Sequence, residues 1–140
     1  FAEVAVRLYE KATGKTATYK DMTAFTDTKN PEIFKAYELG IISGMGANKA
    51  APSNLITREQ IASMMQRAAK AVNPDADFST DGAEAFSDEK LISSWALASM
   101  KFMNKNGFMK ILNGNINPKG TTTREQAVLI VVRIYEKYSN

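Results

Sequence analysis

The chain repeats one pattern three times: FAEVAVRLYEKA at Phe1–Ala12, IASMMQRAAKAV at Ile61–Val72 and AVLIVVRIYEKY at Ala127–Tyr138. In each stretch the apolar residues fall at positions i, i+3, i+4, i+7, i+8 and i+11. This spacing places them on one face of an α-helix. Internal repetition of this kind is typical of folds built from equivalent units. We therefore predict three equivalent helices whose apolar faces form the core.

The second and third of these helices begin with the same signal. Thr57-Arg58-Glu59-Gln60 and Thr123-Arg124-Glu125-Gln126 both fit a capping box, in which the threonine caps a backbone N–H and the glutamine reaches back. The first helix has no such start, because Phe1 already lies inside its pattern. We therefore expect the chain to be a fragment that begins within a repeat.

A second shared unit lies upstream of each box. Phe25-Thr26-Asp27 matches Phe86-Ser87-Asp88, and each leads into a helical stretch that ends at a glycine, Gly40 or Gly107. A glycine at this point suits a helix C-cap. Within the later stretch we predict an apolar face made of Leu91, Trp95, Ala98 and Phe102. The segments 13–24 and 73–85 are rich in turn-forming residues and are predicted to be linkers.

These elements predict an all-α fold of helix-loop-helix repeats. One pair of helices cannot bury its own apolar face, whereas three equivalent helices that meet about a pseudo-threefold axis bury all three faces together. Val4, Met64 and Ile130 are then expected in one central core. The predicted organisation is the last helix of a truncated repeat at 1–14, a second repeat at 15–74 and a third at 75–140.

Composition excludes several classes of function. The 140 residues include 44% hydrophobic residues, as in a globular protein, and carry a net charge of +3. Cysteine and histidine are both absent, which removes the usual zinc sites, thiol nucleophiles, histidine-dependent triads and disulfides. No apolar run is long enough for a membrane span, and no basic stripe indicates nucleic acid. We expect no cofactor.

The ordered motifs resemble the S-layer homology domain. The residues that carry the resemblance are Phe25-Thr26-Asp27, Gly40-Ile41-Ile42-Ser43-Gly44, Ile56-Thr57-Arg58-Glu59-Gln60, Phe86-Ser87-Asp88, Trp95 and Thr123-Arg124-Glu125-Gln126. The resemblance implies a three-pronged spindle in which grooves between repeats bind a secondary cell-wall polysaccharide that is attached to peptidoglycan. It also implies that the signature arginine is needed for binding. The expected host is a larger surface or secreted protein, outside the cell on the wall or S-layer of a bacterium, most often a Gram-positive one.

In many members of that family the polymer carries pyruvate ketals, which present a carboxylate on a sugar. A guanidinium and the backbone N–H groups at a helix N-terminus suit a carboxylate, so we expect Arg58 and Arg124 to contact it. Thr57 and Thr123 belong to the same segments, although their main role is capping. Trp95 suits stacking on a sugar, although a tryptophan at such a position is more often core. The loop residues expected to bond sugar hydroxyls or shape the site are Ser43, Gly44, Asn48, Asn113 and Asn115.

The sequence departs from the family pattern at Ile111, which stands where the second glycine of the turn is expected. Only two Thr-Arg segments are present, because none precedes Phe1, so we predict at most two competent sites. The site that depends on the third repeat's altered loop is expected to be the weaker. One alternative is a protein-binding or self-assembly module that binds no glycan. An enzyme is the other alternative, because Asp27 and Asp88 could form a carboxylate pair. Repeat-equivalent residues are expected to lie far apart, so we predict no enzymatic activity.

Overall fold

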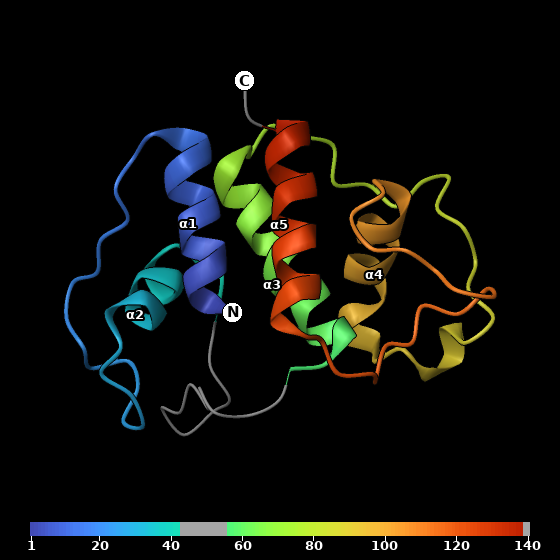
Figure 1. Cartoon of the computed structure of the whole chain (residues 1–140), viewed down its shortest axis with the longest axis horizontal. Helices are drawn as coiled ribbons and strands as arrows, with labels where there is room; N and C mark the ends of the chain where they lie inside the picture. Colours follow the sequence, from blue (N-terminus) through green and yellow to red (C-terminus); the bar gives the residue numbers. More distant parts are fainter. Residues whose placement is uncertain (43–55, 139–140) are drawn as a thin grey trace.

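The computed structural model describes residues 1–42 and 56–138, and within these ranges every regular element is helical. Figure 1 shows the elements in chain order. They are α1 (Ala2–Thr13), α2 (Pro31–Glu38), α3 (Arg58–Val72), the 3₁₀ turns η1 (Glu89–Leu91) and η2 (Ser94–Ala96), α4 (Leu97–Lys105) and α5 (Arg124–Tyr138). The all-α prediction is confirmed, and the predicted linkers contain no regular element outside the last residue of α1.

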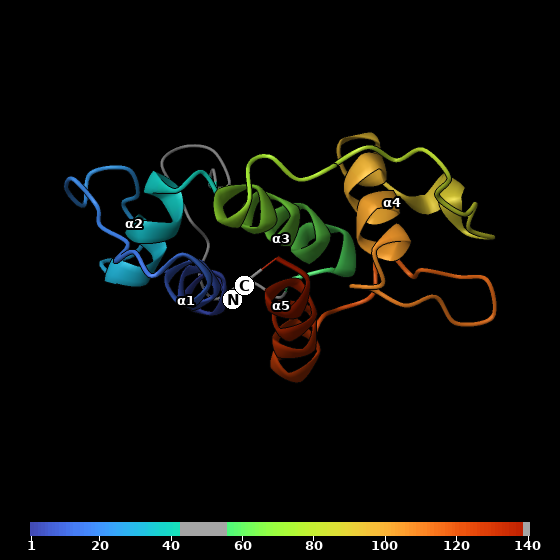
Figure 2. The ribbon, with the colours of Figure 1, turned by 90° about the horizontal axis from the view of Figure 1, so that it is seen from above.

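The three helices of the repeated pattern, α1, α3 and α5, all contact one another. Seen from above, they form a central group (Figure 2). One core cluster takes buried residues from all three, among them Ala5, Met65 and Ile134. Ile130 belongs to this cluster, Met64 packs against it and Val4 is buried. The packing of the three central helices against one another is therefore confirmed, although Val4 is not a member of this cluster. A pseudo-threefold symmetry stays a prediction.

Both predicted capping boxes are present. The backbone N–H of Gln60 donates to Thr57 Oγ1 at 3.3 Å, and Gln60 Oε1 accepts from the N–H of Thr57 at 2.8 Å. The corresponding distances at Thr123 and Gln126 are 3.1 and 3.0 Å. These side chains satisfy backbone groups that have no partner within the helix. The starts of α3 and α5 therefore follow from four-residue segments of sequence.

The other helices flank this centre, and each one packs on the preceding repeat. α2 packs on α1, and α4 packs on α3. Figures 1 and 2 agree on this arrangement, with α2 beside α1 on one side of the molecule and α4 beside α3 on the other. Gly40 and Gly107, which follow α2 and α4, have φ of 78° and 76°. The next N–H in each case donates back into the helix, Ile41 to Ala36 O and Phe108 to Met103 O, both at 2.9 Å. This pattern ends a helix at a left-handed residue, as predicted.

The apolar face predicted from Leu91 to Phe102 is wrong. Of its four members only Phe102 is buried, while Leu91, Trp95 and Ala98 are exposed. The segment is not one helix, because the chain is extended at Ile92 and Ser93 between η1 and η2. This break shifts the inward-facing residues, and the buried apolar set is Ile92, Ala96, Met100, Phe102 and Met103.

Candidate functional site

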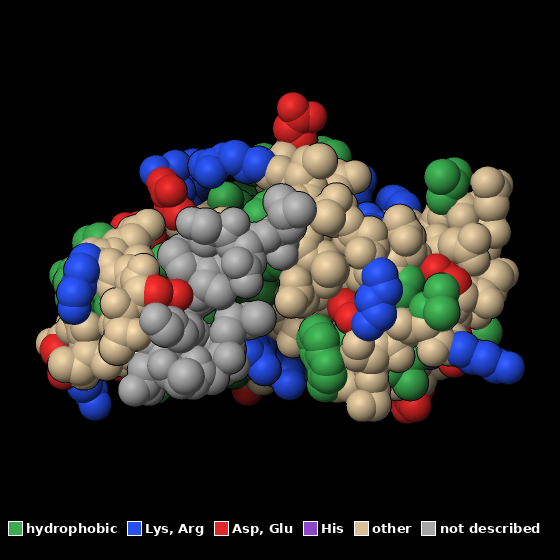
Figure 3. Space-filling view, turned by 90° about the horizontal axis from the view of Figure 1, so that it is seen from below, with side chains coloured by type: hydrophobic (Ala, Val, Ile, Leu, Met, Phe, Trp, Pro, Cys, Tyr) green, Lys and Arg blue, Asp and Glu red, His purple; other side chains and the backbone are tan. Residues whose placement is uncertain are grey.

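The N-terminal ends of α3 and α5 lie at the same end of the molecule (Figure 1). These ends carry the two Thr-Arg segments, and residues 89–96, which include η1 and η2, lead into α4 nearby. Seen from that end, Lys and Arg side chains lie next to exposed apolar side chains (Figure 3). The predicted arginines are therefore presented toward one face of the molecule, whereas the individual surroundings of Arg58 and Arg124 differ.

Arg58 is tied into the protein. Its Nε donates to Ile116 O at 2.7 Å, and its Nη2 donates to Lys110 O at 3.1 Å. Burial also lowers the pKa of Arg58 from its ordinary value, although the nearby Asp88 carboxylate acts in the opposite direction. A guanidinium is not deprotonated within a protein, so Arg58 keeps its positive charge. Arg58 therefore joins the second repeat to the loop of the third, and only part of its guanidinium edge remains for a ligand.

The expectation that α3 offers backbone N–H groups to a carboxylate is wrong. The N–H of Arg58 donates to Gly120 O at 2.8 Å, and the N–H of Glu59 donates to Pro118 O at 3.0 Å. The Gln60 N–H is taken by the Thr57 side chain. The loop of the third repeat therefore covers the N-terminus of α3 and satisfies its donors. An anion at this end must be held by side chains.

Glu59 forms a buried polar cluster that the sequence did not indicate. Its side chain is held by Lys119 Nζ at 2.5 Å and by Ser93, whose N–H and hydroxyl both donate at 2.8 Å. Burial raises the pKa of Glu59, but these hydrogen bonds outweigh that effect and leave its pKa below the ordinary value. Lys119 also donates to Ser93 Oγ at 2.6 Å, while more than half of its side chain is exposed. An ammonium is thus held at a fixed place beside the start of α3.

The loop of the third repeat is a tight turn. Leu112 and Asn115 exchange backbone hydrogen bonds of 2.9 and 3.0 Å, and both residues between them, Asn113 and Gly114, have positive φ. An Asn-Gly pair with positive φ is typical of a type I′ turn. Asn113 and Asn115 are exposed, so their amides face solvent as the prediction requires. The predicted residues Ser43, Gly44 and Asn48 lie outside the described residues.

Asp88 holds this loop in place. Its Oδ1 accepts from the N–H of Ile116 at 3.0 Å, and its Oδ2 accepts from the N–H of Asn117 at 2.8 Å. Both carboxylate oxygens are therefore engaged by the backbone of the loop. This structural role leaves Asp88 poorly suited to acid or base catalysis.

Trp95 is exposed over 57% of its surface, so it is not a core residue. It belongs to η2, which packs on α3. Ser93, two residues before Trp95, donates to Glu59 near the start of α3, so Trp95 belongs to a segment that is tied to this helix start. Its exposed ring is open to a flat ligand. Aromatic side chains at such positions present a large apolar surface with little conformational entropy to lose.

Arg124 and Thr123 at the start of α5 are both exposed. The Thr123 hydroxyl is used as the helix cap, while the Arg124 side chain makes no hydrogen bond or ion pair with another residue in the described ranges. At the same point of α3, Arg58 is held by two carbonyls. Of the two signature arginines, Arg124 therefore has the more accessible guanidinium.

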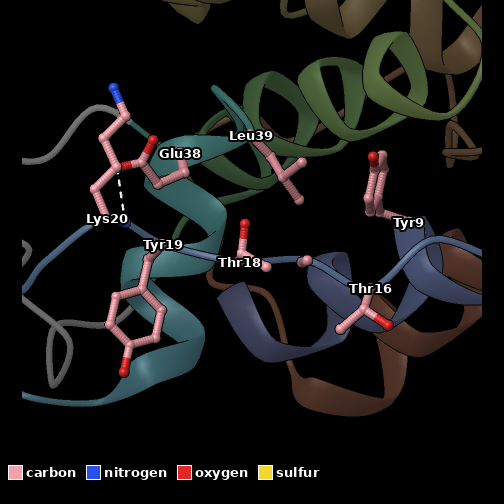
Figure 4. Close-up of a pocket in the computed structure, with 8 residues that line it drawn as sticks. Tyr9, Thr16, Thr18, Tyr19, Lys20, Glu38 and Leu39 are labelled. Carbon is pink, nitrogen blue, oxygen red and sulfur yellow. Dashed lines mark hydrogen bonds between the residues drawn. The ribbon is translucent and has the colours of Figure 1, made fainter.

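A shallow cavity of about 290 Å³ lies elsewhere, between α1, the following linker and the end of α2 (Figure 4). Its walls include Tyr9, Thr16, Thr18, Lys20 and Glu38. The N–H of Lys20 donates to the Glu38 carboxylate at 3.4 Å across one side. None of the predicted site residues lines this cavity.

Within residues 1–42 and 56–138, no group of three or more acidic residues is arranged to hold a metal ion. No helix in residues 1–42 and 56–138 has the length and hydropathy needed to cross a bilayer.

Comparison with known proteins shows one matching family and several similar proteins. A family model described as the S-layer homology domain matches residues 18–62 and 85–128, together more than half of the chain. An amylopullulanase of Thermoanaerobacterium thermosulfurigenes is 37% identical over 83% of the chain, and an exoglucanase XynX of Acetivibrio thermocellus is 36% identical over 83%. An endoglucanase of a Bacillus strain is 31% identical over 91%. The matched stretch spans only 6%, 11% and 14% of these three enzymes.

Proposed function

The chain belongs to the S-layer homology family, a family of cell-surface anchoring modules, and we propose that it holds a larger protein on the bacterial wall by binding an anionic secondary cell-wall polysaccharide. The observation that carries this proposal is that similar stretches occur within larger enzymes. Such a stretch makes up 14% or less of three enzymes that bear different names. A stretch shared by such enzymes has a role independent of the substrate that each one cleaves. Attachment outside the cell is such a role.

The ligand we propose is a carboxylate-bearing sugar such as a pyruvate ketal. The protein has a net charge of +3, and the described face carries exposed Lys and Arg side chains beside apolar ones (Figure 3). Trp95 is also exposed. A carboxylate prefers a guanidinium or an ammonium, and a sugar ring prefers an aromatic face. The chemistry of the exposed groups therefore suits an acidic saccharide better than a neutral or apolar ligand.

Two positions on this face are proposed to bind the polymer. At the start of α3, the Lys119 ammonium, the remaining edge of Arg58 and the Trp95 ring surround a helix end whose backbone donors are already used. The exposed amides of Asn113 and Asn115 lie on the loop that covers that end. At the start of α5, the proposed contact is the exposed guanidinium of Arg124. Lys119 was not expected from the sequence, because a lysine in a Pro-Lys-Gly loop is common on any surface.

Binding to purified cell-wall sacculi tests the proposal. The chain is expected to co-sediment with intact sacculi and to remain in solution when the polymer has been removed from them. Arg124→Gln is expected to weaken binding by roughly 10- to 100-fold, which corresponds to about 1.5–3 kcal/mol for a hydrogen bond to a charged group. Lysine at position 124 is expected to restore binding only in part, because it lacks the bidentate geometry.

Arg67→Gln is the matched control, because Arg67 is an exposed arginine on α3 at a point away from both helix starts. This variant is expected to bind as the parent chain does. Equal retention on stripped and intact sacculi would contradict the anchoring mechanism. If the Arg124→Gln variant and the Lys119→Gln variant both bound sacculi as well as the parent chain does, the residue assignment would be contradicted. The anchoring role would remain intact.

A further inference from the structure

The chain contains two Asn-Gly sequences, and the fold gives them different surroundings. Asn106-Gly107 directly follows α4, whereas Asn113-Gly114 forms the centre of the turn in the third repeat's loop. Asn-Gly is a dipeptide in which asparagine readily loses its side-chain amide, because glycine has no Cβ to hinder its own backbone nitrogen. The two sites share this sequence, so any difference in their reactivity comes from the structure around them.

The loss of the amide needs water and base, but no enzyme. The glycine nitrogen, after losing its proton to base, attacks the carbonyl carbon of the asparagine side chain. A new C–N bond closes a cyclic imide, and the amide nitrogen leaves with a proton from solvent as ammonia. Water then opens the imide at either carbonyl and gives aspartate or isoaspartate. The reaction therefore requires a glycine N–H that solvent base can reach and an asparagine side chain that can turn toward it.

At Asn106 hydrogen bonds block both requirements. The Gly107 N–H donates to Asn104 O at 3.0 Å. The Asn106 side-chain amide donates to Phe102 O at 2.9 Å. The next residue, Phe108, is only 1% exposed and belongs to the common core. This helix end therefore opens only if part of the core opens with it, which is costly.

At Asn113 neither group is held. Within residues 1–42 and 56–138, no acceptor receives the Gly114 N–H, and the Asn113 side chain forms no hydrogen bond. The turn is closed by the two backbone hydrogen bonds between Leu112 and Asn115, which are both exposed. The turn itself contains no buried residue, so it opens at a lower free-energy cost than the end of α4.

We propose that Asn113 is a site of spontaneous deamidation, and that isoaspartate formed there releases the third repeat's loop from the start of α3. Isoaspartate adds one carbon to the main chain ahead of Gly114, where there is little room. The Gly114 carbonyl accepts the N–H of Ser87 at 2.8 Å, and a Cβ on Gly114 would lie 2.6 Å from Ser87 Oγ. The same loop supplies Ile116 O to the Arg58 guanidinium. The inference rests on these loop contacts and not on glycan binding.

Peptide mapping by mass spectrometry tests the site. The folded chain is incubated at mildly alkaline pH in isotope-labelled water, whose oxygen enters only residues that deamidate. Trypsin then places the two asparagines in separate peptides, 106–110 and 111–119, and fragmentation identifies the residue that changed. Asn113 is expected to deamidate at least about tenfold faster than Asn106, because two hydrogen bonds must break before Asn106 can react.

The unfolded chain is the control for this comparison. In denaturant the rates at Asn113 and Asn106 are expected to become similar, because the dipeptide is the same and the protecting contacts are gone. If Asn106 reacted as fast as Asn113 in the folded chain, the proposal would be overturned. The same holds if Asn113 stayed intact in the folded chain under conditions in which the unfolded chain loses both amides.

Hydrogen exchange tests the release of the loop. The N–H groups of Arg58 and Glu59 donate to carbonyls of the loop, so both are expected to exchange faster in the isoaspartate fraction, which ion exchange separates by its added negative charge. Asn113→Gly is the matched variant, because two glycines suit this turn and leave no amide to lose. Exchange in this variant is expected to stay constant during the same incubation. Unchanged exchange at Arg58 and Glu59 in the isoaspartate fraction overturns the proposed release.

Discussion

At the scale of single residues, Arg58 and Arg124 show how equivalent sequence positions acquire different roles. Both follow a capping threonine, but Arg58 donates to the carbonyls of Ile116 and Lys110, whereas Arg124 is exposed. The difference arises because the loop of the third repeat docks on the start of α3. A motif match alone therefore does not say which arginine is available to a ligand.

The two arginines are expected to differ in their effect on stability. Arg58→Gln removes the donor to the partly buried carbonyl of Ile116 and to the exposed carbonyl of Lys110, and it is expected to cost about 1–3 kcal/mol. Arg124→Gln removes an exposed side chain and is expected to change stability by no more than about 0.5 kcal/mol. Urea denaturation of both variants measures the difference. Equal destabilisation by the two substitutions would show that Arg58 is not held as described.

Glu59 is expected to make stability depend on pH. Its folded pKa lies below its unfolded value, so its contribution is fully present above the unfolded pKa of about 4.3 and is lost as pH falls through the lower folded pKa. Glu59→Gln is expected to cost about 1.5–3 kcal/mol at pH 7, the usual worth of hydrogen bonds to a charged group. Denaturation curves between pH 2 and pH 7 should converge for parent and variant at the acid end. A constant difference over that range would contradict the assignment.

At the scale of elements, the helix starts and ends follow local rules, while the loop of the third repeat depends on what it touches. Gly114 has φ of 82°, and a Cβ there would lie 2.6 Å from Ser87 Oγ. Its carbonyl also accepts the N–H of Ser87 at 2.8 Å. The Asn-Gly turn is thus pressed against the Phe-Ser-Asp segment of its own repeat, and both conformation and space require glycine.

Gly114→Ala is therefore expected to destabilise the protein more than Gly82→Ala. Both glycines have positive φ, which costs a non-glycine residue about 1–2 kcal/mol, but a Cβ at Gly82 meets nothing within 4 Å. The difference between the two variants isolates the contact with Ser87. Thermal unfolding followed by circular dichroism measures it. Equal shifts in melting temperature would mean that the loop moves away from Ser87 at little cost.

At the scale of the whole molecule, the flanking helices make the repeats interdependent. Because α2 packs on α1 and α4 packs on α3, each described repeat contributes to burying the central helix of the one before it. The core cluster extends without interruption from α1 to α5. Such an arrangement predicts one cooperative unit rather than repeats that unfold in turn.

Ile134→Ala tests this cooperativity. Ile134 is fully buried in the common core, and its truncation is expected to cost about 2–5 kcal/mol. Circular dichroism, which reports on all helices, and the emission of Trp95, the single tryptophan, should shift to the same new midpoint. Leu129→Ala, at an exposed position on the same helix, should leave that midpoint nearly unchanged. Separate transitions for the two probes would show that the third repeat unfolds alone.

The sequence by itself determined the three central helices, their capping boxes and the glycines that end α2 and α4. These features depend on periodicity and on contacts within a few residues, which a linear pattern records. Only the tertiary structure decided that Arg58 is held by the loop of the next repeat, that Trp95 is exposed and that Lys119 stands beside Glu59. Each of these depends on segments that are distant in the chain, up to 60 residues apart for Lys119 and Glu59. The sequence also did not reveal the break at Ile92–Ser93. An apolar spacing predicts which residues share a helical face only where the helix is continuous. The segment from η1 to α4 is not continuous, because its backbone is extended at these two residues.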